Sequence, residues 1–217
     1  MNIPSTLSML LFLLTLLGIP QGSFGADLCL VNANVFDGQK TLGKAHIALE
    51  DGRIVHVGSD LDGVQCTETR DLQGKWVIPG LIDSHIHFFQ SASLYTRPDI
   101  LDGRALMSYE DDQSYVRKHL HDTFLRYLAS GVTAVVDVGG PFWNFSIRKQ
   151  SLTDADAPAV AVAGPLISTV SRPQLDLGDP PIIQATSPQH AQELVKAQLK
   201  HKPDLIKVWF ILPEDGD

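Results

Sequence analysis

The pattern of apolar and polar positions changes twice along the chain, and the first stretch is at the N-terminus. Residues 7–19 are almost wholly apolar and are followed by small residues, a pattern typical of a secretory signal peptide. The run is shorter than the roughly 20 apolar residues that a spanning helix needs. We therefore expect a signal peptide over residues 1–25, although residues 1–6 contain no Lys or Arg. The protein is then exported, periplasmic or secreted, with no membrane attachment after cleavage.

The second stretch, residues 26–76, has short alternating segments. Apolar alternation predicts strands at 28–35, 45–49 and 53–58. The dipeptide Asp51-Gly52 between the last two is a strong signal for a β-hairpin turn. We expect a small β-sandwich-like domain here, forming the N-terminal part of a β domain.

In the third stretch, residues 77–217, strand and helix patterns alternate. A continuous apolar run at 77–82 predicts a strand buried on both faces. Further strands are expected at 132–138, 159–163 and 204–210. Helices are expected from Ser108 to Gly131, over 144–152 and over 188–199, the last opened by Ser187-Pro188. Alternation of this kind predicts an α/β fold with a parallel sheet.

Two architectures fit this alternation: a doubly wound open sheet, or the first half of a TIM-type (β/α)₈ barrel. The first strand is followed by no dinucleotide-binding fingerprint. The expected long loops, 88–109 and 166–186, both follow strands, on the face where barrels place their active sites. We therefore prefer a truncated barrel with strands 1–4 in residues 77–217.

Composition narrows the class of protein. The chain is 44% hydrophobic and 19% charged, which is typical of a globular protein. Its net charge of −8 is spread along the sequence, so we expect no nucleic-acid partner. Cys29 and Cys66 would be able to pair in an exported protein, but their spacing does not establish proximity. We interpret them as two small buried apolar residues.

His85 and His87 are the main candidates for chemistry. They stand two apart at the end of a predicted strand, so both side chains project to one side of it, where they can reach one metal ion. Asp83 has the same parity and is a candidate for orienting a histidine. A pair of exposed or merely packed histidines is the alternative. The apolar strand favours the metal site, since polar groups there are costly without a role.

Three sequence blocks, 32–38, 50–58 and 71–87, resemble the opening of the amidohydrolase superfamily in order and spacing. Residues 131–140 resemble the second barrel strand of its imidazolonepropionase-related members, which include prolidase-like enzymes. The resemblance covers residues 26–217. It implies a composite β domain built from both chain ends, beside a barrel that holds one or two divalent metal ions, with zinc the expected metal.

The resemblance also assigns residues. His85 and His87 match the ligands of the first strand, and Lys207 matches a lysine of strand four that is carboxylated and bridges two ions in binuclear members. A lysine in an apolar strand is also hard to leave charged; the alternative is a side chain that extends to solvent or pairs with a carboxylate. The family's later ligands have no positions in this chain. We therefore expect an incomplete, inactive fragment without a catalytic residue of its own.

Weaker candidates lie nearby. Tyr95 and Arg97 are on the loop after the ligand strand and are candidates for substrate binding, Arg being the natural partner of a carboxylate. Pairing at the loop surface is the alternative. Asp137 ends the second strand at the same mouth and is a candidate for supporting the metal ligands.

For the whole protein we expect a hydrolase that uses metal-activated water to cleave a carbon–nitrogen bond in a small amide, cyclic amide or dipeptide. The expected partner is a small-molecule substrate, and a homo-oligomer is compatible with the sequence. One alternative is a deaminase or lactonase of the same fold. Another is a barrel that has lost catalysis and serves as an exported binding module.

Overall fold

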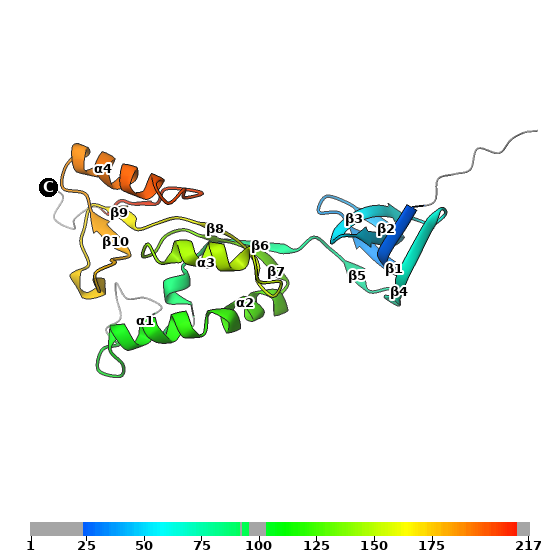
Figure 1. Ribbon diagram of the computed structural model, residues 1–217, viewed down its shortest axis with the longest axis horizontal. Helices are drawn as coiled ribbons and strands as arrows, with labels where there is room; N and C mark the ends of the chain where they lie inside the picture. The colour runs from blue at the N-terminus through cyan, green and yellow to red at the C-terminus, as the bar shows by residue number, and fades with distance from the viewer. Residues whose placement is uncertain (1–23, 92, 96–102, 212–217) are drawn as a thin grey trace, which may run out of the picture. The chain divides into compact units, whose positions relative to one another are not determined.

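The computed structural model describes residues 24–91, 93–95 and 103–211 of the chain. The chain divides into two compact units, Met1–Pro79 and Gly80–Asp217 (Figure 1). Arg97 and most of the expected signal peptide lie outside the described residues. Within the described part, no helix is both long and apolar enough to cross a membrane.

The first unit is built on one mixed β-sheet. Its strands are β1 (Phe24–Phe36), β2 (Thr41–Glu50), β3 (Arg53–Gly58), β4 (Val64–Asp71) and β5 (Trp76–Val77). The order is β3-β2-β1-β4, with β5 also paired to β1. The hairpin predicted at Asp51-Gly52 joins β2 to β3, and both turn residues have positive φ (49° and 71°). The described residues form a single sheet, so the sandwich-like arrangement stays a prediction.

A disulfide joins Cys29 of β1 to Cys66 of β4, with their Cα atoms 5.8 Å apart. Our interpretation of two unpaired cysteines was therefore wrong. The physical reason is that β1 and β4 are parallel neighbours, with Ala26 opposite Cys66 and Cys29 opposite Thr69. This register brings together two residues 37 positions apart in sequence, and no local sequence pattern reports it.

The second unit is α/β, as predicted, with strands and helices that alternate along the chain. Its strands are β6 (Leu81–Ile86), β7 (Val132–Asp137), β8 (Ala159–Val162), β9 (Leu166–Ser168), β10 (Ile182–Gln184) and β11 (Val208–Trp209). Its helices are η1 (Phe88–Gln90), α1 (Tyr109–Lys118), α2 (Leu120–Ala129), α3 (Asn144–Ser151), η2 (Pro173–Leu175) and α4 (Pro188–Leu199). The strands form two parallel sheets, β6-β7-β8 and β10-β9-β11.

The helix starts follow the sequence signals. Ser108 caps α1 by accepting the Asp111 N–H, and Ser187 caps α4 by accepting the His190 N–H. The single helix expected up to Gly131 is instead interrupted at His119 (φ −104°, ψ 22°). At this position the Tyr115 carbonyl accepts the His119 N–H (3.0 Å), as in a continuing helix, and also contacts His119 Nδ1 (2.9 Å). The result is two helices, α1 and α2, that run nearly in line (Figure 1).

Two expectations about the end of this unit were wrong. The expected loop 166–186 contains β9, η2 and β10, and the strand expected over 204–210 is reduced to β11. Asp204 explains the second difference. Its carboxylate accepts the Val162 N–H (2.8 Å) while its own N–H donates to the Val162 carbonyl (3.0 Å). The Asp204 side chain thus replaces one of the backbone hydrogen bonds that a regular strand would make with β8.

The core of this unit lies around β6, β7 and β8 and the helices α2 and α3. Ile86, Phe88, Phe124, Val135 and Ile147 are all buried in one cluster. The Phe88 and Phe124 rings meet edge to face at 5.9 Å. Burying each such side chain contributes about 1.5–3 kcal/mol. Because Ile86 and Phe88 flank His87, this packing fixes the end of β6.

Candidate metal site

The structure brings His85 and His87 together at the carboxyl end of β6. Their ring centroids are 5.5 Å apart and the rings are nearly perpendicular, at 80°. Between them Ile86 is buried in the core, whereas His85 is exposed and His87 is half-buried. The alternation of a strand therefore presents two imidazoles outside the core at one edge of the sheet.

The orientation of the His87 ring is fixed by a backbone group. Nδ1 of His87 lies 2.7 Å from the carbonyl oxygen of Gly139, in the segment after β7. A carbonyl oxygen only accepts hydrogen bonds, so Nδ1 carries the proton and Nε2 keeps its lone pair. Metal-binding histidines are commonly held in this way, with the second ring nitrogen donating to a carbonyl or carboxylate.

The electrostatic surroundings keep His87 neutral. Burial lowers the pKa of His87, and the hydrogen bond to Gly139 opposes this effect. The positive charges of His85 and Lys207 lower the pKa of His87 further. Neutral imidazole is the form that binds a metal ion, so the environment favours a ligand over a cation.

Lys207 lies directly before β11 and is half-buried. Its carbonyl accepts the Ile167 N–H at 3.0 Å. The positive charge of Lys207 acts on His87, whose pKa it lowers. His85 belongs to β6 and His87 directly follows it, whereas Lys207 directly precedes β11, a strand of the other sheet of this unit.

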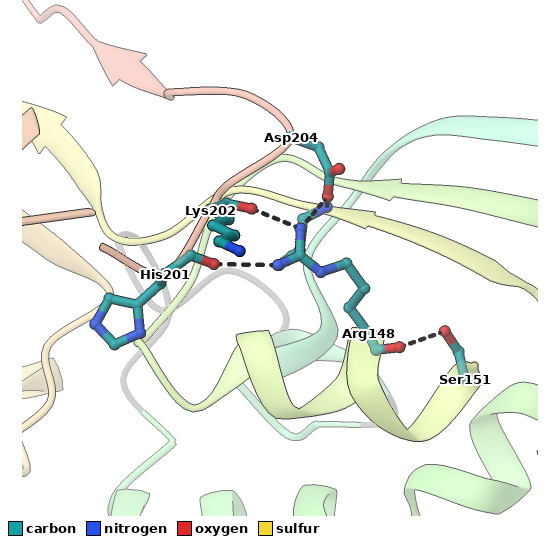
Figure 2. Close-up of polar contacts among 6 residues, drawn as sticks. Arg148, Ser151, His201, Lys202 and Asp204 are labelled. Carbon is teal, nitrogen blue, oxygen red and sulfur yellow. Dashed lines mark hydrogen bonds and ion pairs between the residues drawn. The ribbon is translucent and has the colours of Figure 1, made fainter. Parts of the chain in front are cut away.

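Arg148 of α3 anchors the segment that leads to Lys207 (Figure 2). Nη1 of Arg148 lies 2.7 Å from Asp204 Oδ2 and 2.8 Å from the Lys202 carbonyl, and Nη2 lies 3.1 Å from the His201 carbonyl. One guanidinium therefore binds two carbonyl groups just after α4 and the carboxylate of Asp204, three residues before Lys207.

The two carboxylates expected to support the ligands have different positions. Asp83 is half-buried, and its Oδ1 accepts the backbone N–H of His85 at 3.2 Å rather than a ring N–H. Asp137 is fully buried, and its Oδ1 accepts the Gly139 N–H at 3.1 Å. Burial raises the pKa of Asp137 to about 7, against hydrogen bonds from Gly139, Phe88 and Asn144 that lower it. Asp137 thus acts on the segment that holds His87.

Tyr95 does not have the geometry expected of a substrate-binding residue. Its side chain is 4% exposed, and its hydroxyl donates to the Met107 carbonyl at 2.5 Å. Its ring meets that of Tyr109 edge to face at 5.3 Å, in a small core that also contains Leu175. These contacts give Tyr95 a packing role in the described residues. The other candidate, Arg97, lies outside them.

Two residues near the site were missed by the sequence reasoning. Gly139 supplies the acceptor for His87, and Asn144 donates from Nδ2 to Asp137 Oδ2 at 2.5 Å. The available signal was the pair Gly139-Gly140 directly after an apolar strand. Such a pair often marks an unusual backbone conformation.

The donor set fits part of a divalent-metal site. Two neutral imidazoles on one strand suit zinc and similar ions, which usually take four ligands from protein and water. Across the residues with described positions, no group of three or more His, Cys, Asp and Glu side chains is placed to hold a metal ion. His85 and His87 are the two candidate ligands with adjacent rings, and the role of Lys207 stays a prediction.

Comparison with known proteins shows a partial match to one family. Residues 76–161 match the sequence model of the amidohydrolase family. An adenine deaminase of Lactobacillus delbrueckii subsp. bulgaricus is 33% identical over 84 residues, 38% of this chain and 14% of that protein. An allantoinase of Desulfitobacterium hafniense (strain Y51) is 44% identical over 64 residues, 29% of this chain and 13% of that protein. Residues 76–161 are therefore similar to the amidohydrolase family, a match that covers less than half of the chain.

Solved amidohydrolase structures share the fold. A crystal structure of an amidohydrolase matches with a TM-score of 0.63 and 22% identity, over 83% of this chain and 46% of the other. A prolidase complexed with N-methylphosphonate-L-proline matches with a TM-score of 0.60 and 21% identity, over 83% of this chain and 46% of the other. An A. niger ochratoxinase matches with a TM-score of 0.60 and 20% identity, over 85% of this chain and 47% of the other. This chain therefore spans less than half the length of these structures.

Proposed function

We propose that this chain carries part of the divalent-metal site of a hydrolase that cleaves carbon–nitrogen bonds in small molecules. The observation that carries the proposal is the bond from His87 Nδ1 to the Gly139 carbonyl, which leaves Nε2 free beside His85. His85 and His87 would hold the ion. A bound divalent ion supplies Lewis-acid polarisation of a carbonyl and makes water more acidic.

The other residues of the site have supporting roles in this proposal. Asp137 orders the Gly139 backbone by accepting its N–H, and Gly139 holds the His87 ring. Arg148 and Asp204 fix the approach to Lys207. We propose Lys207 as a further ligand, carboxylated in the binuclear form of the site, because it is half-buried and directly precedes β11, which pairs in parallel with β9.

We propose that the second unit is the first half of a (β/α)₈ barrel. Its strands pair in parallel and in sequence order from β6 to β8, and β9 then pairs with β11. Coverage of 46–47% of the matched structures supports this interpretation. In such a barrel, residues beyond the carboxyl ends of the strands form the active site, which is where His87 and Gly139 lie.

Zinc binding tests the proposal directly. Isothermal titration calorimetry of the chain with zinc should give a binding isotherm, and the double variant His85→Ala/His87→Ala should lose it. The matched control is His119→Ala/His121→Ala, because this pair has the same spacing but lies at the junction of α1 and α2. Equal zinc affinity in the first variant and the wild type would overturn the proposal.

Deamination is a second candidate for the whole protein. Its support is that several relatives are named adenine deaminase, with 33–40% identity over 72–89 residues. Release of ammonia from adenine by the metal-loaded protein would favour this reaction. Release of free proline from a proline-containing dipeptide would favour amide hydrolysis.

We also propose that the protein is exported. The apolar segment 7–19 supports this, and so does the disulfide, because disulfides persist in oxidising compartments. N-terminal sequencing of the mature protein should find residue 26 or a close neighbour. A cytosolic product that retains residues 1–25 would contradict the proposal.

A further inference from the structure

Asn144 of α3 has no contact with the candidate ligands, yet it is connected to one of them. We infer that Asn144, through Asp137 and the Gly139 backbone, is a positioning residue that keeps the His87 ring in the form with the proton on Nδ1. The inference rests on the proposed function in one respect: it matters for chemistry only if His87 binds the metal.

Three hydrogen bonds make the connection. Asn144 Nδ2 donates to Asp137 Oδ2 at 2.5 Å, Gly139 N donates to Asp137 Oδ1 at 3.1 Å, and His87 Nδ1 donates to Gly139 O at 2.7 Å. The N–H and the carbonyl of Gly139 belong to different peptide planes, on either side of one φ, ψ pair. The bond to Asp137 holds the first plane, so the carbonyl direction then depends only on the φ and ψ of Gly139.

The backbone of Gly139 needs this restraint because its conformation is unusual. Its φ is +133°, a region that residues with a side chain rarely adopt and that glycine leaves readily. A Cβ at Gly139 would lie 2.7 Å from Leu166 Cδ1 and 3.2 Å from the Gly164 carbonyl. The tight fit excludes a side chain, so the conformation depends on Asp137 instead.

Asn144 is a costly residue at its position. It is fully buried, and its Oδ1 has no hydrogen-bond partner among the described residues. A buried unpaired carbonyl destabilises a fold, and an apolar residue of similar size would avoid that cost. Turning the amide over would place Oδ1 instead of the Nδ2 donor against Asp137 Oδ2. The remaining benefit of asparagine is its bond to Asp137.

The test compares Asn144→Leu with a matched control, Gln198→Leu. Gln198 is also a buried amide of the second unit, with Nε2 bonded to the Pro165 carbonyl (2.6 Å) and Oε1 unpartnered among the described residues. Nitrogen-15 NMR of the metal-free protein should show one His87 tautomer in the wild type and in Gln198→Leu, and a mixture in Asn144→Leu. Zinc affinity should fall by roughly tenfold or more in Asn144→Leu, with no comparable loss in the control.

The outcomes separate the inference from the proposed function. An unchanged tautomer in Asn144→Leu overturns the inference even if the wild type binds zinc. Failure of the wild type to bind zinc overturns the proposed function, and the tautomer comparison still decides the inference. If Asn144→Leu does not fold, Asn144→Ala, which removes the same donor without added bulk, gives the same NMR comparison. A mixture of tautomers in a folded Asn144→Ala protein supports the inference, and a single tautomer overturns it.

Discussion

Arg148 and Asp204 form an ion pair with Nη1 and Oδ2 2.7 Å apart, and the same guanidinium binds the carbonyls of His201 and Lys202. The pair thus joins α3 to the chain between α4 and Lys207. It is partly shielded from solvent, with the two side chains 24% and 43% exposed. Its distance is shorter than those of the other hydrogen bonds that Arg148 and the Asp204 carboxylate make, which are 2.8–3.1 Å.

Removing the guanidinium should destabilise the second unit. We expect Arg148→Met to lower the free energy of unfolding by about 1–3 kcal/mol, since hydrogen bonds of a charged group are lost while the apolar stem is kept. Urea denaturation measures the change. The control Arg70→Met removes the ion pair with Glu68, whose two side chains are 63% and 59% exposed. We expect it to lower the free energy of unfolding by less than about 1 kcal/mol. Equal effects of the two variants would contradict the assigned role.

Replacing both cysteines should destabilise the first unit. The disulfide closes a loop of 37 residues, and loops of this length are expected to add about 3–4 kcal/mol by limiting the unfolded chain. Unfolding of Cys29→Ser/Cys66→Ser, or of the wild type with a thiol reductant, measures the loss. Zinc binding at His85 and His87 should persist, because those residues belong to the second unit. A concurrent loss of zinc binding would argue against that separation.

Asp137 should make the stability of the metal-free protein depend on pH. Its pKa is raised from 3.8 to about 7, so between these values the native state holds a proton that the unfolded state has lost. The free energy of unfolding should then fall as pH rises from about 4 to 7, by at most roughly 1.4 kcal/mol per pH unit. It should level off above pH 7.

Denaturation at several pH values checks this dependence. Asp137→Asn should remove the slope, whereas Asp122→Asn, which changes an exposed carboxylate of α2, should keep it. A wild-type protein whose stability is flat across this window would contradict the raised pKa of Asp137.

Adding a methyl group at Gly139 should damage both the fold and the site. Gly139→Ala introduces a side chain at φ +133° and into contact with Leu166, and we expect a loss of about 1–3 kcal/mol. Zinc binding should weaken as well. Gly178→Ala is the control: its φ is +91°, but a Cβ there meets nothing within 4 Å. It should reduce stability less and leave zinc binding unchanged.

Carboxylation of Lys207 is open to a direct measurement. With carbon-13 bicarbonate and zinc present, NMR should show a carbamate carbon that is absent from Lys207→Met. The control Lys196→Met changes an exposed lysine of α4 and should retain the signal. A wild-type spectrum without the carbamate carbon would instead favour a site with a single ion.

The features that the sequence predicted correctly are those set by local patterns. The caps at Ser108 and Ser187 depend on residues three positions apart, and the shared side of His85 and His87 follows from the period of a strand. The interruption at His119 was missed because the apolar spacing continues through it. The structure shows His119 Nδ1 beside the Tyr115 carbonyl at this point, a contact that apolar spacing does not report.

The features that were missed depend on contacts between distant residues. Gly139 lies 52 positions from His87, and its role requires the register between β6 and β7. The pairing of Cys29 with Cys66 likewise depends on the register of β1 and β4. The burial of Tyr95 against Tyr109 was likewise not visible from its position on a loop.

The bond between Cys29 and Cys66 also decides what a protease can release. The exposed turn at Asp51 and Gly52 lies inside the covalent ring that this bond closes. After a single cut at that turn, the disulfide still joins the two pieces, because one cysteine lies on each side of the cut. The nicked protein therefore migrates as one molecule. Two pieces appear only after a thiol reduces the sulfur bridge.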